Sequence, residues 1–343
     1  MFRQLRHRQT KGAANSRVGA NITAPHLDST PQRMHIVEQH TSPELAVPKA
    51  ARVLQQLSGV PTFEDAYATR HPFGAYNVSL TSIARRLLAV VEALDQVQRQ
   101  AQLLVVAKSL QDEPLLEAMD HLLDALMEHM GVCNGILRAF FAPADDKKFK
   151  KSLSAFKASV EPYRKHIGTI DNYIKHNQGK LRSIHFRWPT GISCGYFVEG
   201  PLASGVLGPV AVVHPGENTA FSFSRDLAYH LCSVFAVGAQ LAHALHCIDR
   251  RLVVQPPLTT VEVRDSDWSK AIRLTAALPA IYFPDEVSKP IPRIQVSASK
   301  VLIEYPALRF KVSGPPLGSQ ISLTFGGDGV TKSFKMPYFH EGA

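Results

Sequence analysis

Residues 171–182, DNYIKHNQGKLR, mark the point at which the character of the sequence changes. Before this stretch, apolar residues recur at spacings of three and four, which is the period of an amphipathic helix. After Gly179 the period shortens to the alternation of β-strands, and a glycine at this place is typical of a helix end. The sequence therefore predicts an α+β protein, with an antiparallel helical bundle followed by a mainly antiparallel β domain.

The bundle is expected to contain four amphipathic helices joined by short turns. An acidic residue followed by proline at Glu113-Pro114 and again at Glu161-Pro162 is a helix-start signal. A shorter helix over residues 42–57 precedes them. Consecutive amphipathic helices with short connections form antiparallel bundles. The four predicted helices cover residues 79–110, 112–141, 145–160 and 161–178.

The second half of the chain alternates and turns like an antiparallel sheet. One long apolar helix, residues 224–248, interrupts it and is expected to be buried. We divide the chain into a disordered basic tail over residues 1–41, a helical bundle domain over 42–180 and a mainly β domain over 181–343. The predicted strands cover residues 181–188, 192–200, 208–214, 261–265, 293–299, 301–305, 308–313, 320–325 and 332–336.

Composition indicates a globular protein with a reducing, cytoplasmic location. The chain has 343 residues, of which 45% are apolar. Its four cysteines form no CxxC pair, which favours buried thiols over disulfides. No uninterrupted apolar run reaches the roughly 18 residues that a membrane span requires, so we expect no membrane insertion.

The positive charge is concentrated in one segment. The whole chain carries a formal charge of +9, and residues 145–187 hold eleven basic and four acidic residues. Clustered lysine suits non-specific attraction to phosphates. We expect one basic helical face that binds RNA or another polyanion. Its candidate residues are Lys147, Lys148, Lys150, Lys151, Lys157, Lys175, Lys180, Arg182 and Arg187.

The motif DNYIKH resembles the helix-borne motif of HEPN domains, which are helical bundles found in RNA-cleaving proteins. The family pattern is an arginine, a polar residue, three residues of any type and a histidine. Asn172 and His176 match its last two elements, whereas Asp171 stands at the arginine position. The resemblance covers at most residues 79–180. It implies a metal-independent ribonuclease in which His176 is the general base and Asn172 supports it.

Three functions therefore remain open. The first is a non-catalytic binding or accessory protein that uses the basic face over residues 147–187, and whose β domain docks a protein or a second copy. The second is the HEPN-type ribonuclease. The third is a structural protein without a nucleic-acid role, in which Lys175 and His176 merely favour the negative end of a helix dipole.

No cofactor or metal site is expected. His243 and Cys247 lie four residues apart in the motif HALHC and have a metal-ligand spacing. No second histidine or cysteine pair accompanies them. We therefore interpret them as packed residues of the apolar helix.

Overall fold

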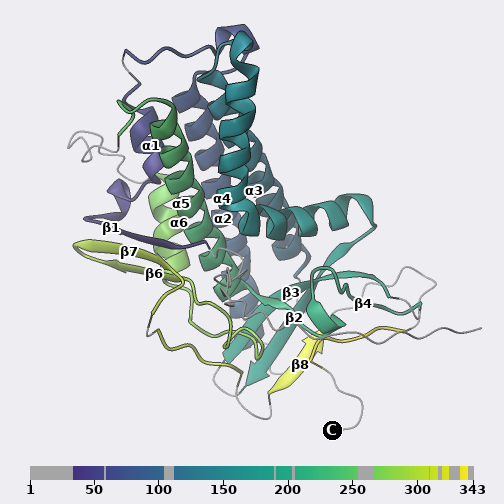
Figure 1. Ribbon diagram of the computed structural model, residues 1–343. Helices are drawn as coiled ribbons and strands as arrows, with labels where there is room; N and C mark the ends of the chain where they lie inside the picture. The colour runs from purple at the N-terminus through teal and green to yellow at the C-terminus, as the bar shows by residue number, and fades with distance from the viewer. Residues whose placement is uncertain are drawn as a thin grey trace, which may run out of the picture. The chain divides into compact units, whose positions relative to one another are not determined.

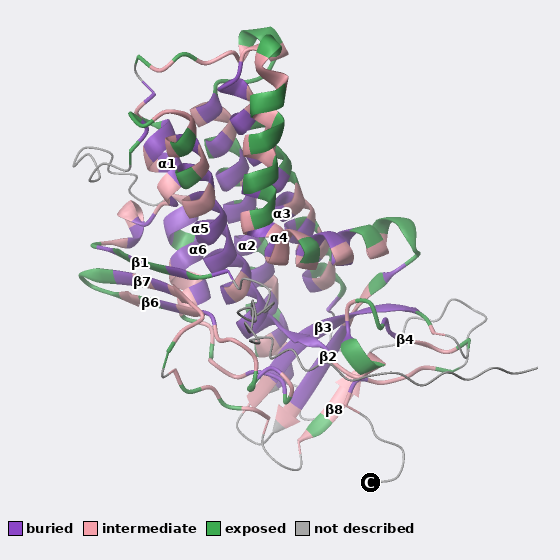
Figure 2. Cartoon of the chain, viewed as in Figure 1, coloured by how far each residue is buried: buried purple, intermediate pink, exposed green. Residues whose placement is uncertain are grey.

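A long apolar helix, α5 (Phe223–Ile248), forms the centre of this computed structural model (Figure 1). Eighteen of its 26 residues are buried. Figure 2 colours most of α5 as buried. By length and composition α5 resembles a membrane span, but 61% of its most apolar window is buried inside the protein. It contacts α1, α3, α4, α6 and strands of both sheets. The predicted buried helix is thus confirmed.

The structure describes residues 34–338, except for residue 58 and the segments 104–111, 189–190, 203–204, 254–265, 309, 316–318 and 324–332. Most of the predicted tail, residues 1–33, lies outside this range. The tail prediction is wrong for residues 36–40, which form strand β1 (Ile36–His40). Its residues are alternately buried and exposed, and it pairs with β7 (Lys300–Tyr305), a partner too distant in sequence for local periodicity to reveal.

Two long helices of the bundle agree with the predicted pattern. They are α2 (Pro72–Leu103) and α3 (Glu113–Ala139), which pack against each other. Proline in the first turn is favourable because its missing N–H would have no helical partner there. This explains why α2 begins at Pro72, ahead of the predicted start. The predicted helix over 42–57 is divided at Pro48 into a 3-10 turn and α1 (Lys49–Leu54).

Helix α4 (Asp146–His176) is a single helix where the sequence predicts two. Pro162 lies inside it and removes one backbone hydrogen bond, which kinks but does not end the helix. The buried residues of α4 keep their helical spacing on both sides of Pro162, so packing against the core holds both halves in the helical conformation. Because a 31-residue helix rises roughly 46 Å, its two ends cannot lie side by side as two antiparallel helices would. The buried line is Phe156, Val160, Tyr163, Ile167 and Ile170.

The strands form two antiparallel sheets, as predicted. A three-stranded sheet has the order β1-β7-β6, and a five-stranded sheet has the order β4-β3-β2-β8 with β5 paired to β3. Nine residues of β2 pair with β3 directly after the end of α4. The remaining strands are β2 (Lys180–Trp188), β3 (Gly191–Pro201), β4 (Leu207–Pro209), β5 (Phe221–Ser222), β6 (Arg293–Ser297) and β8 (Gln320–Leu323).

Four segments differ from the predicted strand pattern. In the described part of residues 332–336, Phe334 forms an isolated β-bridge with Leu207 and no strand. In residues 208–214 only the short β4 is a strand, and the chain then turns. Residues 308–313 form no strand where the structure describes them. Helix α6 (Asp267–Ala276) was not expected; its N-terminus is capped by the Ser266 hydroxyl, which accepts a hydrogen bond from Ser269 N at 3.1 Å. The predicted strand over 261–265 lies outside the described residues.

One apolar core crosses the predicted domain boundary at residue 180. Leu87 from α2, Val198 from β3 and Leu231 from α5 belong to the same buried cluster. A smaller cluster, which includes Phe186 and Phe283, lies on the opposite face of the five-stranded sheet. Residues 32–343 form one compact unit. The helices and the sheets therefore share their core.

The close packing of α5 against its neighbours gives a stability prediction. A methyl group on Gly238 would lie 2.5 Å from Pro48 Cβ and 2.9 Å from Tyr76 OH. We expect Gly238→Ala to lower the free energy of unfolding by about 1–3 kcal/mol, because the steric cost exceeds the gain in helix propensity. Denaturant titration measures this change.

The matched control is Gly131→Ala, on the exposed face of α3. A methyl group there meets nothing within 4 Å. The only expected effect of that substitution is the higher helix propensity of alanine. The free energy of unfolding should therefore rise by about 0.5–1 kcal/mol. Equal effects of the two substitutions would contradict the packing described around α5.

Candidate functional site

The residues predicted to be catalytic lie on open surface. Asn172 and His176 are on one face of the last turns of α4, and both are exposed. The Asn172 carbonyl accepts a hydrogen bond from the Asn177 side chain at 3.5 Å. Neither Asn172 nor His176 lines the cavities described below. The pair is accessible, and it lies outside both of these cavities of the described chain.

The position that carries arginine in the HEPN pattern is part of an ion pair here. The Asp171 carboxylate lies 2.8 Å from Lys175 Nζ, which also lies 2.8 Å from Asp124 of α3. Hydrogen bonds to Asp124 and then to Asp171 raise the pKa of Lys175. Lys175 is therefore held between two carboxylates and links α4 to α3. Its charge is already balanced by these carboxylates, which weakens its attraction for a phosphate.

The other basic residues near the end of α4 belong to strand β2. Lys180 is exposed at its start. Arg182 donates a hydrogen bond to Glu199 of β3 at 2.9 Å, and only 15% of its side chain is exposed. Arg187 is half-buried further along the strand. Of this group, Lys180 alone projects as an exposed cation.

The lysines at the start of α4 are all exposed, but two of them are paired. Lys148 lies 2.8 Å from Asp145, and Lys150 lies 2.7 Å from Asp146. Four other lysines of α4 have no ion pair with a described residue. At about 100° per residue they fall within an arc of roughly 120° that faces away from the buried line. We name these four the lysine stripe; they are Lys147, Lys151, Lys157 and Lys165.

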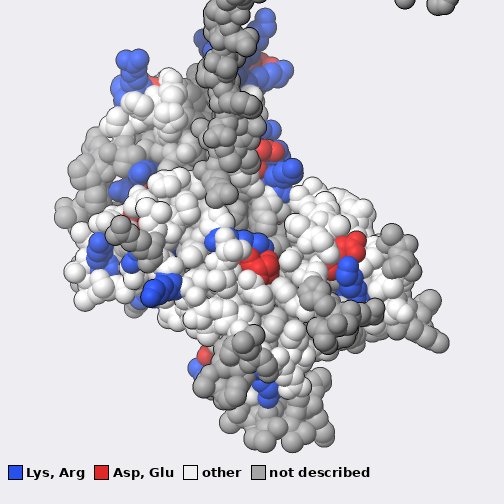
Figure 3. Space-filling view, turned by 60° about the horizontal axis from the view of Figure 1, so that its bottom comes forward, with Lys and Arg blue, Asp and Glu red and all other residues white. Residues whose placement is uncertain are grey.

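The single basic face predicted over residues 147–187 is therefore divided. The physical reason is the continuity of α4, which separates Lys151 from Lys175 by roughly 36 Å of helical rise before the kink is considered. Figure 3 shows one face of the molecule, on which basic side chains lie in separate groups with uncharged surface between them. Binding to a polyanion would depend on the stripe rather than on both ends of α4.

Sequence reasoning missed a buried polar cluster between α4, α5 and β3. Asp226 accepts a hydrogen bond from Tyr196 OH at 2.5 Å and lies 3.2 Å from His230 Nε2. Tyr163 OH lies 3.1 Å from His230 Nδ1. The ring of His166 lies 6.1 Å from that of His230. The spacing of Asp226 and His230, four apart on α5, was the available signal, but it fell in a helix interpreted as an apolar core element.

The charges of this cluster follow from its burial. Burial alone would raise the pKa of Asp226, but the interactions with His230 and the hydrogen bond from Tyr196 lower it instead. Burial lowers the pKa of His166 to about 4, so this imidazole is neutral at pH 7. Asp226 Oδ1 and His166 Nε2 are buried and have no hydrogen-bond partner in the described part of the chain. The cluster therefore has unused hydrogen-bonding capacity.

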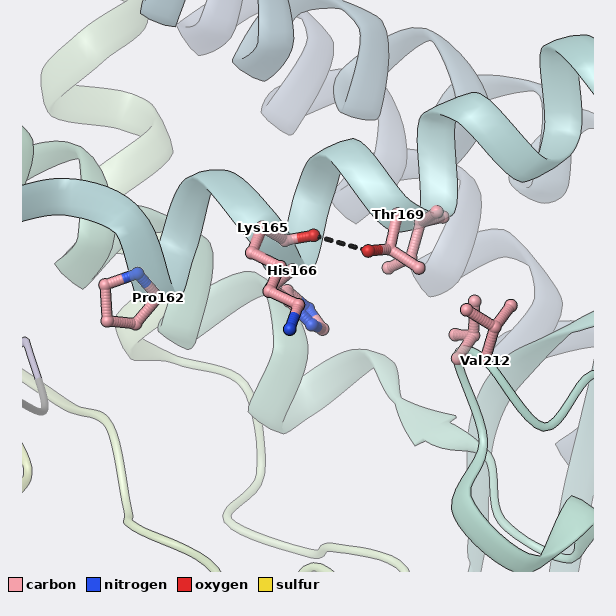
Figure 4. Close-up of a pocket in the computed structure, with 7 residues that line it drawn as sticks. Pro162, Lys165, His166, Thr169 and Val212 are labelled. Carbon is pink, nitrogen blue, oxygen red and sulfur yellow. Dashed lines mark hydrogen bonds between the residues drawn. The ribbon is translucent and has the colours of Figure 1, made fainter. Parts of the chain in front are cut away.

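A cavity lies between α4 and the loop that follows β4, as Figure 4 shows. We name it the α4 cavity; its volume is ≈ 230 Å³. Thr169 donates a hydrogen bond to the Lys165 carbonyl at 2.7 Å on its rim. Its lining residues on α4 recur at helical spacing and so form one helix face. The cavity is lined by Pro162, Lys165, His166, Thr169, Ile170, Val212 and Val213.

The prediction that His243 and Cys247 are packed is wrong, because both are exposed on α5. Cys247 Sγ lies 3.7 Å from His243 Nε2. The nearby His246 lies 3.2 Å from the Leu252 carbonyl and lines, with His243, a second cavity of ≈ 360 Å³. In the described residues, no group of three or more histidine, cysteine, aspartate or glutamate side chains is arranged to hold a metal ion.

No family model, curated protein or solved structure matches this chain. The resemblance to HEPN domains therefore rests on Asn172 and His176 alone and stays a prediction.

Three histidines predict a loss of stability in acid; His129 and His214 are buried and His166 is half-buried. Burial lowers the pKa of His129 and His166 to about 4 and that of His214 to about 3, against 6.5 for an unperturbed histidine. The folded state therefore binds fewer protons than the unfolded state below pH 6.5. The contribution of these neutral histidines to the free energy of unfolding is fully present above pH 6.5 and is lost as the pH falls toward 4. The cost is about 2 kcal/mol for each histidine at pH 5.

Glu286 acts in the opposite direction. Burial raises its pKa to about 7, so its contribution to the free energy of unfolding grows as the pH falls from 7 to 4.5. Three histidines outweigh one carboxyl group. We expect the free energy of unfolding to decrease between pH 7 and pH 5, and His129→Gln to make this decrease smaller. Denaturant titration at both pH values measures it, with the exposed His176→Gln as the control. A decrease that is the same in the wild type and His129→Gln would contradict the assignment.

Proposed function

We propose that the protein is a non-catalytic binding protein that engages RNA or another polyanion through the lysine stripe. The observation that supports this is the arrangement of four exposed lysines without ion partners in the described chain, on one face of α4. From Lys147 to Lys165 the stripe follows roughly 27 Å of helix. Such a line of point charges suits a nucleic-acid backbone and carries no base-specific geometry.

The binding should depend strongly on salt, because each phosphate contact releases counterions. For a single-stranded nucleic acid, about four contacts give a slope of roughly −3 for the logarithm of affinity against the logarithm of salt concentration. Two predictions from the sequence belong to this proposal. They are a cytoplasmic location and the docking of a protein or a second copy of the chain through the β strands.

The ribonuclease is the alternative. A general base must come within hydrogen-bond reach of the proton that it removes, and the exposed His176 can do so only if other groups hold the substrate. Two of the predicted phosphate ligands, Lys175 and Arg182, are engaged by Asp124, Asp171 and Glu199, whereas Lys180 is exposed. This pairing favours binding without cleavage. A structural protein with no nucleic-acid role is the third possibility.

Charge reversal on the stripe tests the proposal. We expect Lys147→Glu/Lys151→Glu/Lys157→Glu to lower the affinity for single-stranded RNA at least tenfold, because it turns three attractive contacts into repulsive ones. Filter binding or fluorescence anisotropy at several salt concentrations measures the affinity and its slope. Lys165 is left unchanged because it also belongs to the α4 cavity.

The control carries the same change of charge on other elements, as Arg250→Glu/Lys300→Glu/Lys311→Glu, all at exposed positions. It should retain most of the affinity. Equal losses in the two triple variants would show attraction by net charge alone, and no binding by the wild type would leave a structural role. Cleavage of the RNA by the wild type that His176→Ala abolishes would establish the ribonuclease instead.

A further inference from the structure

The α4 cavity has an apolar wall and a cationic rim. Pro162, Ile170, Val212 and Val213 form the wall, and Lys165 lies at the edge. Val212 is 63% exposed, which is high for a large aliphatic side chain. An accessible aliphatic surface beside a cation is the arrangement that holds a ligand with one charged and one apolar end.

His166 borders the same cavity in a fixed position. Its ring contacts Phe221 and Tyr229 edge-to-face, with centroid distances of 5.6 and 5.5 Å. Its Nε2 has no hydrogen-bond partner in the described chain. A neutral imidazole carries one N–H and one lone pair, so it can donate a hydrogen bond to a ligand without reorganising.

The charge of the lining selects the sign of the ligand. The seven lining residues include a lysine and no carboxylate. The carboxylate behind His166, Asp226, is already paired with His230 and accepts a hydrogen bond from Tyr196. A cationic ligand would meet the Lys165 ammonium without a counter-charge, whereas an anion would pair with it.

We propose that the α4 cavity binds a small organic anion, a short-chain aliphatic carboxylate. Its carboxylate pairs with Lys165 and accepts a hydrogen bond from His166, and its aliphatic part packs against Val212, Val213 and Ile170. The volume of ≈ 230 Å³ is below that of sites for drug-sized ligands, which limits the ligand to a short chain. Inorganic phosphate would satisfy the cation but leave the apolar wall uncovered.

Methyl NMR of the full chain tests this site. Valine and isoleucine methyl groups are labelled, and pentanoate, its neutral isostere pentanamide, and inorganic phosphate are titrated separately. We expect pentanoate to shift the resonances of Val212, Val213 and Ile170. Pentanamide should bind about five- to tenfold more weakly because it lacks the charge, and phosphate should not shift these methyl groups.

Two substitutions assign the contacts. Lys165→Met should weaken pentanoate binding about five- to tenfold, whereas Lys157→Met, one of the other stripe lysines, should leave it unchanged. Val212→Asp places a carboxylate on the wall at an exposed position and should abolish the pentanoate shifts.

Pentanamide that binds as tightly as pentanoate, an unchanged affinity in Lys165→Met, or pentanoate shifts confined to other methyl groups would each overturn the proposal. If phosphate shifted the same methyl resonances as strongly as pentanoate, the claim that the apolar wall recognises the aliphatic chain would be wrong. The outcome is separable from RNA binding, because Lys147→Glu/Lys151→Glu/Lys157→Glu should still bind pentanoate and Val212→Asp should still bind RNA.

Discussion

The burial of α5 is the constraint on which the rest of the structure depends. An apolar helix of this length is stable in water only when other elements cover most of its circumference. Helices α1, α4 and α6 and strands of both sheets provide that cover. Burial also carries the polar residues near its start into the core, where they need partners. Asp226 and His230 find them in Tyr196 and Tyr163, and Ser222 donates a hydrogen bond to Glu286.

The same constraint explains why α4 is one helix. Its middle must supply Tyr163 to the buried cluster on α5, and its end must supply Lys175 to Asp124 on α3. In this structure α4 makes both contacts as one helix that continues through Pro162. The cost of the missing backbone hydrogen bond is met by packing on both sides of the proline. A consequence is that the basic residues at the two ends of α4 stay apart.

Periodic segments could be predicted from the sequence, and long-range pairings could not. The stripes of α2, α3 and α5 and the strands around Gly179 follow from spacing, as does the exposure of the lysines at the start of α4. The residue with left-handed backbone at the end of α4 is Gln178, with φ of 57°, whereas Gly179 is small because a methyl group would meet the Tyr173 ring. The pairs Asp124–Lys175 and Asp226–Tyr196 join distant segments and leave no local signal.

The two proposed binding surfaces share one residue, and this sharing has an energetic consequence. Lys165 ends the lysine stripe and also forms the rim of the α4 cavity. A carboxylate bound in the cavity would neutralise one of about four cations that meet a phosphate backbone. Binding of the carboxylate would then lower the affinity for the polyanion, and the polyanion would lower the affinity for the carboxylate by the same factor, because the coupling free energy between two sites is reciprocal. Since an exposed ion pair contributes only about 0.2–1 kcal/mol, this coupling would be small, and the ligand would modulate polyanion binding rather than switch it on or off.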